Sequence, residues 1–297
     1  MTTRPKLRRH EEEGHLEVPG GRILYRRFPG GEYLPLLVLH GGPGFTHDYL
    51  TPLEPLVDGR DLVFFDQLGA GRSDRPADER LWRLERFVRE VESVRTALGL
   101  DRMHLLGQSW GGCLAATYAL THPDRIASLV LASPLISVPR WLEDAARLRA
   151  ALPQDVRATL DSHEASQMTS CPEYAAATLF FYKRHFCRLD PWPDPLEQTF
   201  AGMSAEVYET MWGPTEFFCT GNLQDYDLTP RLHDIRVPTL FTCGRHDEAT
   251  PEAMAAFREL VPGAELVVFE ESSHTAHLEE TGLYLVEVGS FLERAER

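Results

Sequence analysis

The segment 107–111 constrains the fold of this chain more than any other, because it places a serine between glycines in the pattern G-x-S-x-G. An apolar run, 103–106, precedes it, and an alanine-rich stretch, 112–119, follows it. A buried strand that passes directly into a helix must turn sharply, and only small residues fit beside such a turn. The pattern therefore predicts a strand–turn–helix unit that raises the hydroxyl of Ser109 above the edge of a sheet.

Apolar runs recur along the chain at intervals that fit an alternation of strands and helices. Each run is short, continuous and bounded by glycine, proline or aspartate, which is typical of strands buried on both faces. Apolar residues at helical spacing over 81–98 predict a helix that ends at Gly99. A turn signal at Pro19-Gly20-Gly21 predicts an antiparallel hairpin across 16–28. The other predicted strands span 34–39, 61–65, 103–106, 127–131, 238–243 and 265–269.

The strand pattern stops after Pro134, and the next hundred or so residues are helical in pattern and rich in aromatic side chains. The alternation of strands and helices returns with the strand 238–243, a helix that starts at Thr250-Pro251, the strand 265–269 and a last helix from about Leu278. We therefore expect an α/β fold with a mostly parallel sheet flanked by helices. Residues 1–134 and 235–297 form its core domain, and residues 135–234 form an inserted, mainly helical cap.

The elbow around Ser109 resembles that of the α/β-hydrolase fold, in which nucleophile, acid and base follow one another in this order along the chain. A serine hydroxyl becomes reactive when a histidine removes its proton and a carboxylate holds that histidine in the right tautomer. Asp247 follows the strand 238–243, and His274 follows the strand 265–269. Both lie at carboxyl ends of strands, where open α/β sheets bind their ligands. Ser109, Asp247 and His274 are therefore the predicted catalytic residues.

Other residues could fill two of these roles. His246 and His277 are alternative bases, and Asp225 and Asp227 are alternative acids, although each could equally be an ordinary solvated residue. His274 is preferred because it lies on the loop directly after a strand, whereas His277 falls toward the last helix.

Acyl transfer also needs backbone N–H groups aimed at the oxygen that becomes negatively charged. The glycine-rich turn 40–44 follows the strand 34–39, which is the position from which this fold supplies one such donor. The residue after the nucleophile supplies the other. Gly42 and Trp110 are therefore the predicted oxyanion donors.

Segments spread over much of the chain resemble the proline iminopeptidase (prolyl aminopeptidase) family. Together they cover roughly 34–279 and look most like the tricorn-interacting aminopeptidase branch of that family. One departure is Gln108, where the family commonly has a small residue; it concerns substrate preference more than the chemistry. The segments that carry the resemblance are 40–44, 66–73 (D-Q-L-G-A-G-R-S), the elbow 107–111, 207–217 and 244–251.

The resemblance implies a serine aminopeptidase that releases an N-terminal residue, preferably proline, from short peptides through an acyl-enzyme without a metal or organic cofactor. Its substrates would be short peptides or amino-acid amides with a free N-terminus. In the tricorn-associated branch two glutamates bind the substrate amine, and these map onto Glu216 and Glu248. The mapping is physically reasonable, since a desolvated ammonium needs carboxylate partners. Glu248 could instead favour the N-terminus of the nearby helix, and Glu216 could be a solvated cap residue.

Composition excludes several other classes of function. Acidic residues outnumber basic ones by 45 to 30, giving a net charge of −15, so a surface that tracks nucleic-acid phosphates is not expected. The charged first residues lack the apolar region of a secretory signal, and no apolar stretch reaches about 18 residues, so we expect a cytoplasmic protein without a membrane partner. Five cysteines without a CxxC pair predict reduced thiols and neither disulfides nor a zinc site. Nothing indicates an oligomeric state.

Two alternative functions follow from the same residues. One is an amidase or esterase that acts on amino-acid amides or other small acyl substrates. The other is a hydrolase-fold binding protein without turnover, against which the complete set of three catalytic residues argues.

Overall fold

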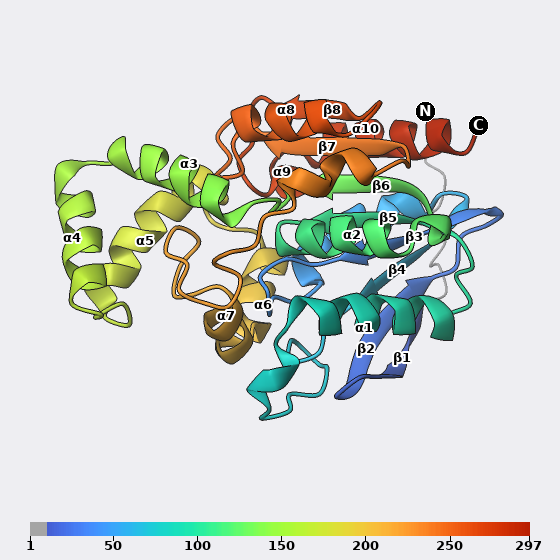
Figure 1. Ribbon diagram of the computed structural model, residues 1–297, viewed down its shortest axis with the longest axis horizontal. Coiled ribbons are helices and arrows are strands. Elements are labelled where there is room, and N and C mark those ends of the chain that lie inside the picture. The colour runs from blue at the N-terminus through green and yellow to red at the C-terminus, as the bar shows by residue number, and fades with distance from the viewer. Residues whose placement is uncertain (1–10) are drawn as a thin grey trace.

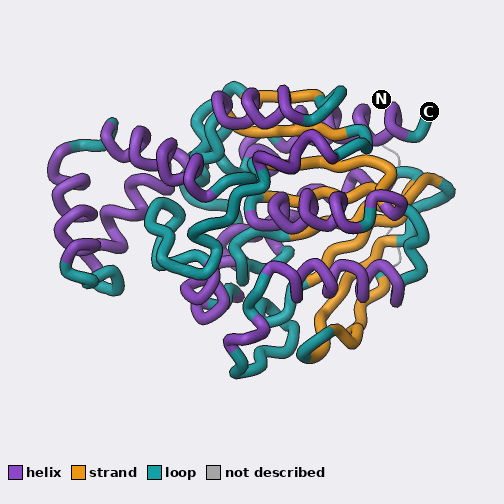
Figure 2. The backbone as a smooth tube through the Cα atoms, viewed as in Figure 1, coloured by secondary structure: helices purple, strands orange, loops and turns teal. Residues whose placement is uncertain are grey.

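The computed structural model describes residues 11–297, so residues 1–10 of the predicted core domain lie outside the description. Its centre is an eight-stranded sheet in the order β1-β2-β4-β3-β5-β6-β7-β8 (Figures 1 and 2). The pairs β1–β2 and β2–β4 are antiparallel, and all other neighbours are parallel. The predicted α/β fold with a mostly parallel sheet is confirmed. The strands are β1 (Glu12–Val18), β2 (Gly21–Phe28), β3 (Tyr33–Leu39), β4 (Arg60–Phe65), β5 (Met103–Gln108), β6 (Ile126–Ala132), β7 (Thr239–Gly244) and β8 (Glu265–Phe269).

Helices cover both faces of the sheet. The crossover from β3 to β4 runs along the sheet in the direction opposite to the crossovers from β4 to β5 and from β5 to β6. Because such crossovers are right-handed, the β3–β4 connection, η1, lies on the face opposite to α1 and α2. α1 packs beside α2, which Figure 1 shows in front of the sheet, and α10 packs against η1. The elements are η1 (Asp48–Val57), η2 (Glu79–Leu81), α1 (Leu84–Ala97), α2 (Trp110–Thr121), η3 (Pro123–Arg125), α8 (Pro251–Leu260), α9 (Ala276–Glu279) and α10 (Thr281–Ala295).

This change of direction creates a switch point between β3 and β5. Loops that leave the carboxyl ends of two such strands turn to opposite faces, and the crevice between them is where open α/β sheets bind ligands. The glycine-rich turn 40–44 follows β3, and Ser109 follows β5. Topology alone therefore brings these two segments together.

The inserted segment, residues 135–234, lies between β6 and β7 and is helical throughout its regular structure. In Figure 1 its helices extend beyond one end of the sheet, with α4 farthest from it. Large side chains such as Trp141, Phe186 and Trp212 join the core of the sheet, whereas α3, α4 and α5 enclose a smaller apolar cluster around Leu160 and Phe181. Its elements are α3 (Val138–Ala150), α4 (Gln154–Ala165), α5 (Pro172–His185), α6 (Asp194–Gly202), α7 (Ala205–Met211) and η4 (Thr229–Asp234).

Two helix boundaries differ from the sequence expectation. The helix predicted over 81–98 begins at Leu84, because the extended backbone of Arg83 (φ −140°, ψ 141°) separates it from the turn η2. The single last helix predicted from about Leu278 is divided into α9 and α10, because Glu280 has a non-helical backbone (φ −126°, ψ 47°). Within residues 11–297, no helix combines the length and the apolar character that crossing a bilayer requires.

Candidate active site

The nucleophile elbow is as sharp as its glycines imply. Ser109 has a left-handed backbone (φ 56°, ψ −120°) between the end of β5 and the start of α2. A Cβ atom on Gly107 would lie 2.0 Å from the carbonyl oxygen of Gly111, and one on Gly111 would lie 2.2 Å from that of Leu39. Larger residues at either position would collide with backbone, which explains why both positions are glycine.

Asp247 and His274 lie together at the carboxyl ends of β7 and β8. The Nδ1 atom of His274 lies 2.8 Å from Oδ1 of Asp247, and both side chains are buried. A carboxylate only accepts, so Nδ1 carries the proton and Nε2 is left to act as a base. The Asp247 carboxylate also accepts from the Ala249 N–H at 2.7 Å and from the Ser133 hydroxyl at 2.6 Å. These donors fix the carboxylate and keep it available to the imidazole.

Ser109 is linked to the His274 loop through its neighbour. The side-chain amide of Gln108 donates to the His274 carbonyl at 3.2 Å. Among residues 11–297 the Ser109 hydroxyl has no hydrogen bond to His274. In free enzymes the contact between nucleophile and base is often long or poorly aligned, so this geometry is compatible with the predicted pair.

The alternative acids and bases lie elsewhere. His277 is buried, and its Nε2 atom donates to the Tyr49 carbonyl at 3.1 Å. Burial lowers the pKa of His277 to about 3, so it stays neutral and is occupied by a structural bond. His246, Asp225 and Asp227 are exposed. None of the four lies in the Asp247–His274 contact.

The glycine-rich turn 40–44 passes close to the nucleophile. A Cβ atom on Gly41 would lie 3.1 Å from the Cβ atom of Ser109, so the turn approaches the elbow at a distance that a side chain there would prevent. Gly42 has φ +108°, a conformation that favours glycine. Within the described chain, neither the backbone N–H of Gly42 nor the backbone N–H of Trp110 donates to another protein group. Both predicted oxyanion donors therefore have no protein acceptor among the described residues.

A buried glutamine, Gln67, connects the segments that carry these two donors. Its side-chain amide donates to the His40 carbonyl at 2.9 Å, its backbone N–H donates to His40 Nε2 at 2.9 Å, and its side-chain oxygen accepts from the Trp110 indole at 2.9 Å. Burial lowers the pKa of His40 to about 4, so the ring is neutral and its Nδ1 donates to the Gly41 carbonyl. The sequence marked Gln67 only as part of a resemblance and gave it no role.

Gln108 makes a second connection across the site. Its side-chain oxygen accepts from the Tyr49 hydroxyl at 2.5 Å, and that hydroxyl accepts from the Gly41 N–H at 2.8 Å. Together with its bond to His274, this large residue joins the glycine-rich turn, the elbow and the loop of the predicted base. The departure noted in the sequence thus has a structural use.

The inserted segment forms two walls around His274. The rings of Trp141 and Phe186 lie 5.6 Å and 5.5 Å from the imidazole, measured between centroids. Glu279 accepts from the Ser273 N–H at 2.8 Å and so holds the loop that carries His274. Two rings of the inserted segment thus pack against the imidazole, and its loop is held separately by Glu279.

Glu216 and Glu248 are both buried beside the predicted triad. Glu216 accepts from the Tyr208 hydroxyl at 2.7 Å, and its carbonyl accepts from the Trp141 indole at 2.8 Å. Both carboxylate oxygens of Glu248 are buried and have no hydrogen-bond partner in the described chain. Burial raises the pKa of Glu216, and burial together with the charges of Glu216 and Asp247 raises the pKa of Glu248 well above its ordinary value. Such a pair would gain from a cationic partner.

We expect the buried carboxyl of Glu248 to make stability depend on pH. The unfolded chain loses this proton near pH 4.5, whereas the folded protein keeps it to higher pH. Because the folded state then binds more protons, the free energy of unfolding falls as the pH rises from 4.5 toward the raised pKa. Glu248→Gln should remove this loss. Its free energy of unfolding, relative to that of the wild type, should therefore rise by roughly 1–2 kcal/mol from pH 5 to pH 7.

Urea unfolding of both proteins at several pH values measures this difference. Glu259→Gln is a matched control, because its side chain is 72% exposed and its replacement removes the same formal charge. A stability difference between wild type and Glu248→Gln that stays constant with pH would contradict the expectation.

A pocket of about 420 Å³ opens beside Glu216, mostly between helices of the inserted segment. Of the aromatic residues of the inserted segment, Phe181, Phe186 and Trp212 are buried in apolar cores and do not line this pocket. The aromatic lining consists of Phe45, Tyr174, Tyr182, Trp192, Phe200 and Tyr208.

Comparison with known proteins shows the fold and the family. The family model described as alpha/beta hydrolase fold matches residues 35–281. A proline iminopeptidase of Heyndrickxia coagulans is 44% identical over 94% of this chain and 98% of its own length. The crystal structure of VinJ has a TM-score of 0.91 at 40% identity and covers 96% of this chain and 99% of that one. The crystal structure of a proline iminopeptidase from Mycobacterium smegmatis has a TM-score of 0.89 at 37% identity, with 96% and 98% covered.

These relatives match almost the whole chain, including the inserted segment. Likeness to the tricorn-interacting branch stays a prediction. The fold, the elbow and the relatives together lead to one conclusion: the protein is a serine hydrolase and belongs to the proline iminopeptidase family of α/β hydrolases.

Proposed function

We propose that the protein is a serine aminopeptidase that releases an N-terminal residue, with proline preferred, from short peptides or amino-acid amides. The observation that carries this proposal is the buried carboxylate pair, Glu216 and Glu248, beside Asp247 and His274. An ammonium group placed between two such carboxylates would have its charge neutralised and would supply the missing hydrogen-bond donors of Glu248. It would also fix the distance from the start of the substrate to the bond that is cleaved.

In this proposal Ser109 is the nucleophile, His274 the base and Asp247 the acid of a catalytic triad. The Ser109 oxygen bonds to the carbonyl carbon of the first residue while its proton passes to Nε2 of His274. The carbonyl oxygen takes up the negative charge, and the N–H groups of Gly42 and Trp110 donate to it. Asp247 stabilises the imidazolium that forms.

The intermediate then collapses to an acyl-enzyme. The C–N bond breaks, His274 gives its proton to the leaving amine, and the first residue remains esterified to Ser109. Water, deprotonated by His274, attacks this ester, and the Ser109 oxygen takes back a proton as the free amino acid leaves. Neither a metal nor an organic cofactor takes part in these steps.

Residues 135–234 act as a cap in this proposal and supply the aromatic pocket next to the amine site. An apolar, ring-lined pocket suits the pyrrolidine ring of an N-terminal proline. Neither a nucleic acid nor a membrane is a proposed partner. A cytoplasmic location is also proposed, and it is supported by five cysteines that are all free thiols.

Acetylation of the substrate amine provides the sharpest test of this function. Proline p-nitroanilide should be hydrolysed with a kcat/KM at least about 100-fold above that of N-acetylproline p-nitroanilide, because acetylation removes the charge that pairs with two carboxylates. Equal kcat/KM values on the two anilides would favour a general amidase.

The two glutamates should each contribute to this preference. Glu216→Gln and Glu248→Gln should each lower kcat/KM on proline p-nitroanilide by about 10- to 150-fold, which corresponds to about 1.5–3 kcal/mol for a lost charge-assisted hydrogen bond. Hydrolysis of p-nitrophenyl acetate, which has no amine, should be nearly unchanged. Steady-state kinetics on both substrates measure the contrast.

Glu209→Gln is a suitable control, because Glu209 lies at the same pocket but is exposed. Glu248 is adjacent to Asp247, so its replacement could also disturb the triad, and such damage would slow both substrates alike. Equal losses on the anilide and the acetate would therefore refute the amine-binding role.

A further inference from the structure

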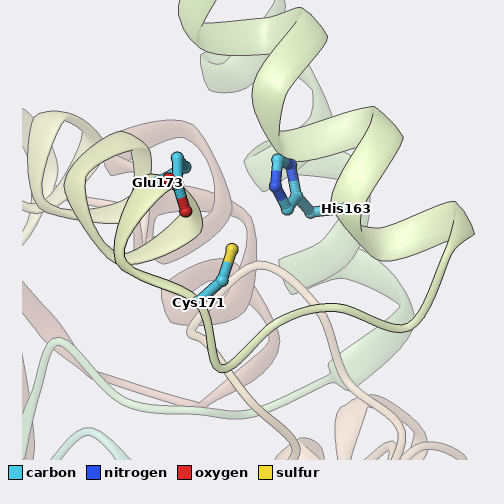
Figure 3. Close-up of side chains that lie close together, drawn as sticks. All are labelled: His163, Cys171 and Glu173. Atoms are coloured by element: carbon cyan, nitrogen blue, oxygen red, sulfur yellow. The ribbon is translucent and has the colours of Figure 1, made fainter.

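The turn between α4 and α5 brings together three side chains of kinds that bind metal ions. Figure 3 shows His163 on α4 facing Cys171 and Glu173 at the start of α5. One ligand atom from each residue lies within 4.8 Å of the other two. His163 and Cys171 are half-buried and Glu173 is exposed, so a solvated ion could reach all three.

The hydrogen bonding of His163 prepares it as a ligand. Its Nδ1 atom lies 2.8 Å from the Thr159 carbonyl of the preceding helical turn. A carbonyl only accepts, so Nδ1 of the neutral ring carries the proton and the lone pair of Nε2 stays free. Histidines that ligate metals usually donate their other ring N–H to a carbonyl or carboxylate, which orients the ring. His163 already has this arrangement through its own helix.

The other two residues complete a mixed set of donors. Cys171 is a free thiol at the N-cap of α5, and Glu173 follows in the first turn of that helix. A set of one imidazole nitrogen, one thiolate and one carboxylate suits zinc, whereas calcium and magnesium prefer oxygen ligands alone. Zinc sites with three protein ligands keep a fourth position for water.

We propose that His163, Cys171 and Glu173 bind one divalent transition-metal ion, zinc by their ligand chemistry, at the α4–α5 turn. Ligand atoms around a tetrahedral zinc lie about 3.3–3.7 Å apart, so the three side chains need to close by roughly 1 Å. Side-chain rotation supplies this movement, because Glu173 is exposed. The proposal departs from the sequence expectation of no zinc site, which relied on the missing CxxC pattern.

The site has a structural role in this proposal. An ion held there adds a link between the end of α4 and the start of α5, which already meet through the turn 166–171 and through the Tyr174 hydroxyl, which donates to Glu164 at 3.0 Å. The ring of Tyr174 lies 6.4 Å from that of His163, between centroids, and also lines the pocket next to Glu216. Metal binding would therefore hold one wall of the proposed substrate pocket, far from the catalytic atoms.

Cobalt(II) and zinc titrations of the whole chain test the site. After chelator treatment, the wild type should bind one Co²⁺ per chain with the near-ultraviolet absorption of a cobalt–thiolate bond, and Zn²⁺ should displace it. Cys171→Ser should abolish that band. His163→Gln should weaken Zn²⁺ binding, measured by calorimetry, by more than the 10- to 100-fold that loss of an outer-shell partner typically costs.

Cys219→Ser is the matched control, because Cys219 is another partly buried free cysteine in the inserted segment but lies outside the cluster. It should leave the cobalt band and the Zn²⁺ affinity unchanged. Near-ultraviolet circular dichroism of the metal-free variants checks that each is folded. No cobalt–thiolate band in the wild type, or a band that survives in Cys171→Ser, would overturn the proposal, as would equal Zn²⁺ affinity in wild type and His163→Gln.

Discussion

Replacing Ser109 with alanine is expected to lower turnover of proline p-nitroanilide on the order of 10⁶-fold while leaving the fold intact. The three residues of a triad act as a unit, and without the serine oxygen no acyl-enzyme can form. The substitution removes one hydroxyl that has no bond to His274 in the described chain, and alanine has the same backbone preferences at the strained elbow. Steady-state kinetics and thermal unfolding check the two halves of this prediction.

A serine-reactive phosphonate separates loss of the nucleophile from loss of structure. It should label the wild type and Ser128→Ala but not Ser109→Ala. Ser128 is a suitable control because it is buried on the neighbouring strand β6, where its hydroxyl contacts His104 at 2.7 Å instead of the site. Near wild-type activity or labelling in Ser109→Ala would rule out the mechanism.

Asp247→Asn is the second large effect, with an expected loss in kcat/KM of about 10²- to 10⁴-fold. If the new amide nitrogen faces His274, the imidazole is held in the wrong tautomer. The Ala249 N–H, which donates to the Asp247 carboxylate at 2.7 Å, favours the other orientation. In that orientation the side-chain oxygen of the asparagine still accepts from the Ala249 N–H and from Nδ1 of His274. The tautomer is then kept, but the imidazolium formed during catalysis has lost its counter-charge.

The exposed residues Asp225 and Asp227 provide controls of the same kind. Asp225→Asn and Asp227→Asn should retain nearly full activity, because neither side chain lies in the contact with His274. Thermal unfolding of Asp247→Asn checks that the loop after β7 survives the change. If one of the exposed aspartates proved more damaging to activity than Asp247, the acid would be wrongly assigned.

Sequence reasoning located the strands well because their burial leaves a local signature. The run 103–106 was predicted as a strand, and β5 extends only two residues beyond it. Helix boundaries were less predictable. α9 and α10 divide at Glu280, whose carboxylate accepts from the Ser272 hydroxyl at 2.6 Å. A hydrogen bond to a loop eight residues away competes with helix continuation, and no local pattern reports it.

The connecting residues of the site were missed for a similar reason. Ser133 donates to Asp247 across 114 positions of sequence, and Gln67 accepts from Trp110 across 43. A serine after a strand and a glutamine in a loop are common, and nothing in their neighbourhoods distinguishes them. Their importance comes from the partners that folding brings to them.

The sequence by itself determined the order of strands and helices, the elbow at Ser109 and the position of Asp247 and His274 after their strands. These follow from local chemistry: glycines permit a sharp turn, and apolar runs must be buried. Only the tertiary structure decided which base meets which acid, that the buried carboxyl groups of Glu216 and Glu248 lie close enough for their charges to interact, and that Trp141 and Phe186 pack against the imidazole. Contacts between distant segments, and the dielectric environment they create, exist only once the sheet and the inserted helices have packed together.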